Sequence, residues 1–303
     1  MYGCVISIDL GSNTLRVLKY DCKSGLFLNE YEKIVKCADN LVYTGEISKE
    51  AIDRIVDALN EAKEEIDFKG CYLKGVATEA LRRAKNQKEV IEEIFKKSQI
   101  QFEVISPDKE ANFTLIAVRE RLKRLGVDNS NFFLLDIGGG SSELIFYKDN
   151  QIKIWSHSLG IVTLTQEGNG DIKKIKELIE KKISFYKEAI SFVNRDTIFV
   201  ATAGTPTTLA AIKVGLNYKN YNRDYINGVI LNKEELDKYL KLLIELPYEK
   251  RVELVGVGRE DLIITGILIF KAFFDLLGFN EAVVVDDGLR EGVALELCKK
   301  LNL

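Results

Sequence analysis

Two aspartates, Asp9 and Asp136, each end an apolar run and stand just before a turn of glycine and small polar residues. The second turn has three consecutive glycines, Gly138 to Gly140, while the first has only Gly11. Backbone N–H groups in such turns can approach a phosphate without a Cβ in the way, and a neighbouring carboxylate can hold Mg²⁺. A single turn of this kind is an ordinary hairpin, but two copies with the same leading aspartate favour phosphate binding.

The two segments form an internal repeat. Residues 4–21 align without a gap with residues 131–148 at an offset of 127 (136 − 9), which pairs Gly11 with Gly138 and Tyr20 with Tyr147. Each copy predicts two strands joined by a tight turn. The sequence therefore predicts two similar α/β domains, 1–126 and 127–303, with a helix from about 290 to 303 that returns to the first domain.

Capping signals and apolar periodicity predict the other elements. Helices are expected at 48–67, capped by Ser48; from Asn86, with Glu89 as a capping box; at 106–125, opened by Ser106-Pro107; at 171–193, capped by Asp171; from Thr205-Pro206; at 232–246, with Asn232 and Glu235 as a capping box; and, as a buried helix, at 262–274. Strands are expected at 72–78, 102–105, 151–157, 197–202 and 282–285.

The composition excludes several classes of partner and of catalytic site. The 43 basic and 46 acidic residues of the 303-residue chain give a net charge of −3, which argues against a broad surface for a nucleic-acid polymer. No membrane span and no signal peptide are visible. The five cysteines form no C-x-x-C pair and predict reduced thiols in the core of a cytoplasmic protein. The only histidine, His157, is expected to be a partly buried strand residue, so catalysis must rest on carboxylates, backbone groups and metal.

Two common phosphate motifs are missing. The chain has no G-x-x-x-x-G-K-[ST] sequence, and the glycines from Gly138 fail G-x-G-x-x-G because position 143 is glutamate. The motifs that are present, D-x-G-S-N-T and D-I-G-G-G-S-x-E, resemble the two phosphate loops of the exopolyphosphatase/guanosine pentaphosphate phosphatase (Ppx/GppA) family. Further matches follow in the family's order at 77–86, 105–111, 203–208, 259–261 and 287–292.

The resemblance implies a short form of that family, without its C-terminal helical domain. It implies two similar domains of the acetate kinase/Hsp70/actin (ribonuclease H-like) type flanking an active-site cleft. Glu110 matches the catalytic glutamate that activates water, and Glu143 matches a second important glutamate. The implied Mg²⁺ ligands are Asp9, Asp136 and Glu143. The implied phosphate-binding residues are Gly11, Ser12, Asn13, Thr14, Arg16, Arg82, Gly138, Gly139, Gly140, Ser141, Ser142, Gly204, Thr205 and Arg259.

Structural explanations stand beside these roles. Glu110 falls in the first turn of the helix opened by Ser106, where a surface carboxylate also complements the helix dipole. Each arginine suits phosphate and equally suits a surface ion pair. The lysine-rich stretch 173–187 contains interspersed glutamates and fits a solvated helix face, with a track for a polyphosphate chain as the alternative.

The implied reaction is Mg²⁺-dependent hydrolysis of terminal phosphoanhydride bonds, in inorganic polyphosphate or in guanosine pentaphosphate to give the tetraphosphate. The resemblance also implies a homodimer. Two other classes are an ATP-dependent kinase of the same superfamily and a non-catalytic sensor of guanosine tetraphosphate. Departures from the family pattern at Pro107, Lys109 and Ala203 put the substrate and the rate in doubt more than the reaction class.

Overall fold

The computed structural model describes residues 3–303, and the chain divides into two compact units. Unit 1 comprises Met1–Ala117 and Leu289–Leu303, and unit 2 comprises Val118–Gly288. The sequence predicts the boundary at 126/127, at the start of the short stretch Gly126–Asn131 that leads to the second copy of the repeat. The structure divides at 117/118, inside the single helix α5 (Pro107–Arg124), because the glycine at 126 marks the end of that helix rather than the end of a unit.

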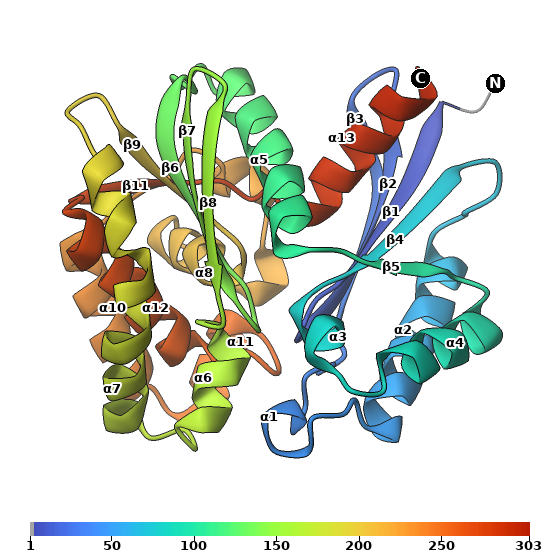
Figure 1. Ribbon diagram of the computed structural model, residues 1–303, viewed down its shortest axis with the longest axis horizontal. Helices are drawn as coiled ribbons and strands as arrows, with labels where there is room; N and C mark the ends of the chain where they lie inside the picture. The colour runs from blue at the N-terminus through green and yellow to red at the C-terminus, as the bar shows by residue number, and fades with distance from the viewer. Residues whose placement is uncertain (1–2) are drawn as a thin grey trace. The chain divides into compact units, whose positions relative to one another are not determined.

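Unit 1 is built on a five-stranded sheet in the order β3-β2-β1-β4-β5. Helix α2 lies on one side of this sheet and α13 on the other (Figure 1). Its elements are β1 (Cys4–Leu10), β2 (Thr14–Asp21), β3 (Leu26–Ile34), α1 (Leu41–Thr44), α2 (Lys49–Glu65), β4 (Tyr72–Ala77), α3 (Glu79–Arg83), α4 (Gln87–Ser98), β5 (Phe102–Val104), the first part of α5, and α13 (Leu289–Leu301).

Unit 2 is built on a six-stranded sheet in the order β10-β11-β9-β6-β7-β8. Its elements are β6 (Asn131–Ile137), β7 (Ser142–Lys148), β8 (Gln151–His157), α6 (Ile161–Glu167), α7 (Ile172–Ile183), the 3₁₀ helix η1 (Ser184–Phe192), β9 (Ile198–Thr202), α8 (Gly204–Lys213), η2 (Tyr218–Asn220), α9 (Arg223–Ile226), β10 (Ile230–Asn232), α10 (Lys233–Glu245), α11 (Tyr248–Val255), α12 (Ile263–Leu277) and β11 (Glu281–Val284).

The two sheets share one topology. In unit 1 three antiparallel strands, β3, β2 and β1, are followed by the parallel strands β4 and β5. In unit 2 the strands β8, β7, β6, β9 and β11 repeat that order and those directions, and β10 is added at the edge. This confirms the predicted α/β class, with two similar units of the actin-like, ribonuclease H-like type.

The repeated hairpins fall where the sequence placed them. Residues 4–21 form β1 and β2, and residues 131–148 form β6 and β7. Strand β6 is apolar and buried along almost its whole length, as expected for a central strand covered on both faces. The register is also repeated, since Asp9 lies opposite Arg16 and Asp136 opposite Glu143.

Several predicted helix starts are confirmed. The Ser48 hydroxyl accepts a hydrogen bond from the N–H of Ala51, and Asp171 accepts from the N–H groups at the start of α7. The backbone N–H of Asn232 donates to the Glu235 carboxylate at 2.8 Å, one half of the predicted capping box. The long apolar stretch forms α12, which is buried along most of its length.

Three helix predictions need correction. The Asn86 side chain caps no helix, because its amide bonds both the N–H and the carbonyl of Ile47. Helix α8 begins at Gly204 rather than being capped by Thr205, and the residue before it, Ala203, has φ 73°. The helix after Asp171 is α-helical only to Ile183 and continues as the 3₁₀ helix η1.

The cysteines also differ from the expectation of reduced thiols. Disulfides join Cys4 to Cys71 and Cys22 to Cys298, and only Cys37 is a free, buried thiol. The first pair meets because β1 and β4 are parallel neighbours that begin side by side. The second meets because α13 packs on β1 and β2. Burial raises the pKa of the Cys37 thiol to about 12.

Within the described part of the chain, none of the helices is both long enough and apolar enough to cross a lipid bilayer.

Candidate functional site

The glycine loop of unit 2 is held from one side. The Gly138 N–H donates to the Ser141 carbonyl at 2.9 Å, and a Cβ on Gly138 would lie only 2.9 Å from that oxygen. The carbonyls of Gly138 and Gly139 accept bonds of 3.0 and 2.7 Å from the N–H groups of Ile161 and Val162 in α6. In a planar trans peptide the N–H points opposite to the carbonyl, so the N–H groups of Gly139 and Gly140 point away from α6. The loop thus turns backbone donors to one side, as a phosphate cradle requires.

Gly160, just before α6, allows this close approach. A Cβ at position 160 would lie 2.2 Å from the carbonyl carbon of Gly140 and 2.5 Å from the Gly139 oxygen. Both are backbone atoms that cannot give way without moving the loop. Glycine at position 160 is therefore required by the packing of the loop on α6.

Two carboxylates stand beside this loop. Asp136 and Glu143 are directly opposite each other in the antiparallel pair of β6 and β7, so their side chains share one face of the sheet. Glu143 is buried, with 1% of its surface exposed. Its Oε1 accepts hydrogen bonds from Ser141 Oγ at 2.7 Å and from Ser156 Oγ at 2.6 Å.

This pair of carboxylates fits Mg²⁺, which prefers hard oxygen ligands and usually takes one or two carboxylates plus water and phosphate. The third predicted ligand, Asp9, belongs to unit 1. Among residues 3–303, no three His, Cys, Asp or Glu side chains come together as a metal-binding group. The donor set that unit 2 supplies by itself is therefore Asp136 and Glu143.

The aromatic residues behind the loop fix its second half. Tyr186 is fully buried, and its hydroxyl donates to the Ser142 carbonyl at 2.8 Å. Burial and the nearby charge of Glu143 raise the pKa of Tyr186. His157 lies opposite Ser142 on β8 and stacks on Phe185, with ring centroids 4.6 Å apart. As predicted, it is a partly buried strand residue.

The corresponding loop of unit 1 has the same turn but different side chains. The Gly11 N–H donates to the Thr14 carbonyl at 3.0 Å, and the carbonyls of Ser12 and Asn13 accept bonds from the segment after β3. Beside it, Arg16 Nε lies 2.8 Å from Glu32 Oε2, and Arg16 Nη1 lies 3.8 Å from Asp9 Oδ2. Burial opposes the charge of Arg16, but the two carboxylates outweigh it and raise its pKa.

Glu110 is held by an arginine from α3. Arg82 Nη1 lies 2.7 Å from Glu110 Oε2 and donates to the Ile105 carbonyl at 2.8 Å, while Arg82 Nη2 reaches Glu79 at 3.0 Å. Burial disfavours the charge on Arg82, and the charges of Glu110 and Glu79 raise its pKa nonetheless. Arg82, predicted as a phosphate ligand, contacts two carboxylates and fixes the orientation of one of them.

The remaining predicted residues lie in unit 2. Gly204 begins α8, and a Cβ there would meet nothing within 4 Å. The Thr205 side chain is buried against α12, where a Cβ on Gly266 would lie 2.0 Å from its Oγ1. Arg259 precedes α12, and its guanidinium carbon lies 5.7 Å from the ring centre of Tyr218.

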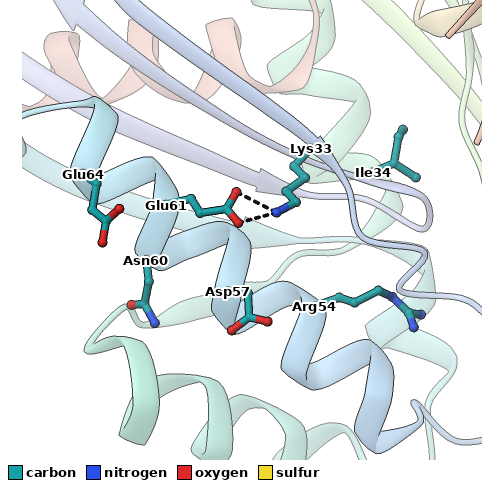
Figure 2. Close-up of a pocket in the computed structure, with 7 residues that line it drawn as sticks. All are labelled: Lys33, Ile34, Arg54, Asp57, Asn60, Glu61 and Glu64. Carbon is teal, nitrogen blue, oxygen red and sulfur yellow. Dashed lines mark hydrogen bonds and ion pairs between the residues drawn. The ribbon is translucent and has the colours of Figure 1, made fainter. Parts of the chain in front are cut away.

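A pocket of about 310 Å³ lies in unit 1 between β3 and α2. Figure 2 shows Lys33 pointing to Glu61, with which it forms an ion pair of 2.5 Å. The lining residues are Lys33, Ile34, Arg54, Asp57, Asn60, Glu61 and Glu64. None of them belongs to the predicted site, and acidic residues outnumber basic ones, which disfavours a polyphosphate as its ligand.

Sequence reasoning missed Ser156. The hairpin turn could have revealed it. Asp149 and Asn150 form a two-residue turn, with φ of 47° and 70°, between Lys148 and Gln151. Such a turn fixes the register of the hairpin. Counting outward from it places Ser156 opposite Glu143. The contact of Arg82 with Glu110 has no comparable signal, because it depends on how α3 and α5 pack.

The comparison with known families identifies the family of the chain. The model of the Ppx/GppA phosphatase family matches residues 20–301. The chain belongs to this family. A crystal structure of the Ppx/GppA family member from Aquifex aeolicus has 30% sequence identity and a TM-score of 0.77, covering 99% of both chains.

Curated relatives carry related names. Exopolyphosphatase 1 of Mycobacterium leprae is 25% identical over 95% of this chain and 87% of its own length. Exopolyphosphatase 2 of Mycobacterium tuberculosis is 25% identical over 97% of this chain and 98% of its own. The bifunctional 3-dehydroquinate synthase/phosphatase of Fusobacterium nucleatum is 27% identical over 96% of this chain, and this chain spans 46% of that protein's length.

Proposed function

We propose that this member of the Ppx/GppA phosphatase family hydrolyses the terminal phosphoanhydride bond of a linear polyphosphate chain, releasing inorganic phosphate. The observation that carries the proposal is the glycine loop of unit 2, with its backbone donors turned to one side and two carboxylates beside it. The names of the mycobacterial relatives support the choice of substrate.

Unit 2 binds and neutralises the group that is transferred. The N–H groups of Gly139 and Gly140 donate to the terminal phosphate, and Asp136 and Glu143 would hold Mg²⁺. The bound ion supplies positive charge that offsets the negative charge of the phosphoryl oxygens. Stabilisation of this kind is usually the largest part of catalysis in phosphoryl transfer.

Unit 1 supplies the base. Glu110 accepts a proton from water as the water oxygen forms its bond to the terminal phosphorus and the bridging P–O bond breaks. Arg82 holds Oε2 of Glu110 by an ion pair of 2.7 Å, so the carboxylate is oriented before substrate binds. Arg82 is thus a positioning residue in this proposal.

The second substrate to consider is guanosine pentaphosphate, whose 5′ end offers the same terminal phosphoanhydride bond. The backbone donors of the unit 2 loop recognise a terminal phosphate and not the group that carries it. The two substrates are therefore expected to share the chemistry and to differ in binding, which appears in KM.

The test is phosphate release from short polyphosphate, long polyphosphate and guanosine pentaphosphate in the presence of Mg²⁺. Replacing Glu110→Gln is expected to lower kcat about 10²-fold or more, because a positioned base contributes on that order. Glu120→Gln is the matched control, since Glu120 lies on the same helix and pairs with Arg124 at 3.1 Å. No release by the folded wild type from any of the three substrates contradicts the proposal. Nucleotide binding without turnover then favours a sensor.

A further inference from the structure

The buried carboxylate of Glu143 is held on one side by two hydroxyl groups. Ser141 Oγ and Ser156 Oγ both donate to the same oxygen, Oε1, at 2.7 and 2.6 Å. A buried carboxylate is stable only if hydrogen bonds replace the water it has lost. Two charge-assisted bonds to one oxygen also restrict rotation of the carboxylate plane.

The two serines come from different elements. Ser141 ends the glycine loop, whereas Ser156 lies on the edge strand β8, directly opposite Glu143. The position of Ser156 is fixed by the ladder between β7 and β8 and not by the loop. The orientation of Glu143 is therefore coupled to the sheet itself, which is more rigid than a loop.

From this geometry we infer that Ser156 is a positioning residue, which fixes the orientation of the Glu143 carboxylate by holding Oε1, so that this carboxylate would be ready to hold the divalent cation. The inference rests on the proposed function, because it concerns the cation that the proposal places at Asp136 and Glu143. It also reassigns Ser141, predicted to bind phosphate. A serine has a single O–H to donate, and that of Ser141 is given to Glu143.

The inference separates two kinds of donor at the loop. The serine hydroxyls orient the metal ligand, and the backbone N–H groups of the glycines bind the phosphate. Removing the Ser156 hydroxyl is then expected to weaken cation binding and lower kcat while KM for the phosphate substrate stays nearly constant. A residue that bound substrate would instead raise KM.

The experiment compares wild type with Ser156→Ala and Ser156→Thr, which keeps a hydroxyl. Mn²⁺ binding without substrate is followed by electron paramagnetic resonance, and kcat and KM are measured for phosphate release. Ser191→Ala is the matched control, because the Ser191 hydroxyl is exposed and donates to the Glu188 carbonyl. Thermal unfolding of each variant checks that it is folded.

For Ser156→Ala we expect about tenfold weaker Mn²⁺ binding and about tenfold lower kcat, with KM within twofold, since one lost bond to a charged group costs about 1.5 kcal/mol. Ser156→Thr is expected to recover most of both losses. Unchanged Mn²⁺ binding in Ser156→Ala overturns the inference, as does the absence of Mn²⁺ binding by wild type. If wild type binds Mn²⁺ in a Ser156-dependent way but releases no phosphate, the proposed function fails and the inference stands.

Discussion

The two hairpins of the repeat have the same backbone pairing, but the residue that faces the aspartate is basic in one and acidic in the other. Each has the same register, the same bond across the turn and an aspartate at the same place, Asp9 or Asp136. Across the neighbouring strands, unit 1 continues with Arg16 and Glu32, whereas unit 2 continues with Glu143 and Ser156. We call each set of three facing residues a row. In the row of unit 1 the charges alternate, and Arg16 forms ion pairs with both Asp9 and Glu32.

The row of unit 2 contains two carboxylates, Asp136 and Glu143, and the hydroxyl of Ser156. Such a row is stable when a cation completes it, because like charges opposite each other in a sheet are otherwise destabilising. The comparison teaches that the fold fixes where the side chains point and the residue opposite the aspartate decides what they bind. Arg16 pairs with Asp9 and Glu32, whereas Glu143 lies opposite a second carboxylate, Asp136, and under the proposed function these two carboxylates hold the cation.

The largest expected difference between the units concerns disulfides. All five cysteines lie in unit 1, and the bond between Cys22 and Cys298 closes a separation of 276 residues. Replacing both by serine is expected to lower the free energy of unfolding of unit 1 by about 4 kcal/mol, since long loops gain most from cross-linking in the chain-entropy model.

The chain's single tryptophan, Trp155, reports on unit 2. Urea unfolding followed by circular dichroism is expected to show an earlier transition in the double variant, while the Trp155 emission transition stays in place. Cys37→Ala is the control for changing a cysteine that forms no disulfide. An equal shift in both signals would mean that the units unfold together and that the disulfide does not act on unit 1 alone.

A smaller effect is expected from Arg16→Glu, which gives unit 1 a row of acidic residues like that of unit 2. The free energy of unfolding should fall by about 2 kcal/mol, less than for a fully buried pair because Arg16 is partly exposed. Millimolar Mg²⁺ should restore part of that loss in urea unfolding, whereas Arg16→Met should not respond to Mg²⁺. If both variants respond alike, charge in the row does not create a cation site.

The smallest effect concerns the residues that follow the matching strands β4 and β9. Ala203 after β9 has φ 73° and ψ −176°, a conformation nearly restricted to glycine, whereas Thr78 after β4 has φ −117°. Ala203→Gly is expected to stabilise the protein by about 1 kcal/mol, and Thr78→Gly to destabilise it by at least that much. Differential scanning calorimetry measures both, and destabilisation by Ala203→Gly would contradict the strain.

Much of the fold follows from local patterns. The hairpins and the strand 151–157 were predicted to the residue because tight turns separate alternating runs. The errors arise where a distant partner overrides a local signal. Asn86 forms a capping-box pattern, yet Ile47 takes its side chain. The disulfides join cysteines that only the packing of strands and α13 brings together.

The residues of the candidate site also divide into those that a local sequence pattern reveals and those that only tertiary packing brings in. Asp136, Glu143 and the glycines are visible in the sequence because they form one short motif. Ser156 can be found by counting residues across the hairpin of β7 and β8. The role of Arg82 could not be found, because its contact with Glu110 crosses 28 residues and depends on tertiary packing. Which residues form motifs is therefore predictable, and which residues orient them is mostly not.

We propose that the cation binds to the row of unit 2 and not to the row of unit 1. The most direct test is Mn²⁺ binding, measured by electron paramagnetic resonance on Asp136→Asn and Asp9→Asn side by side. We expect Asp136→Asn to weaken binding by about 30-fold or more and Asp9→Asn to change it by less than about threefold, since Arg16 already faces Asp9. Equal losses in the two variants, or a larger loss in Asp9→Asn, would contradict the account.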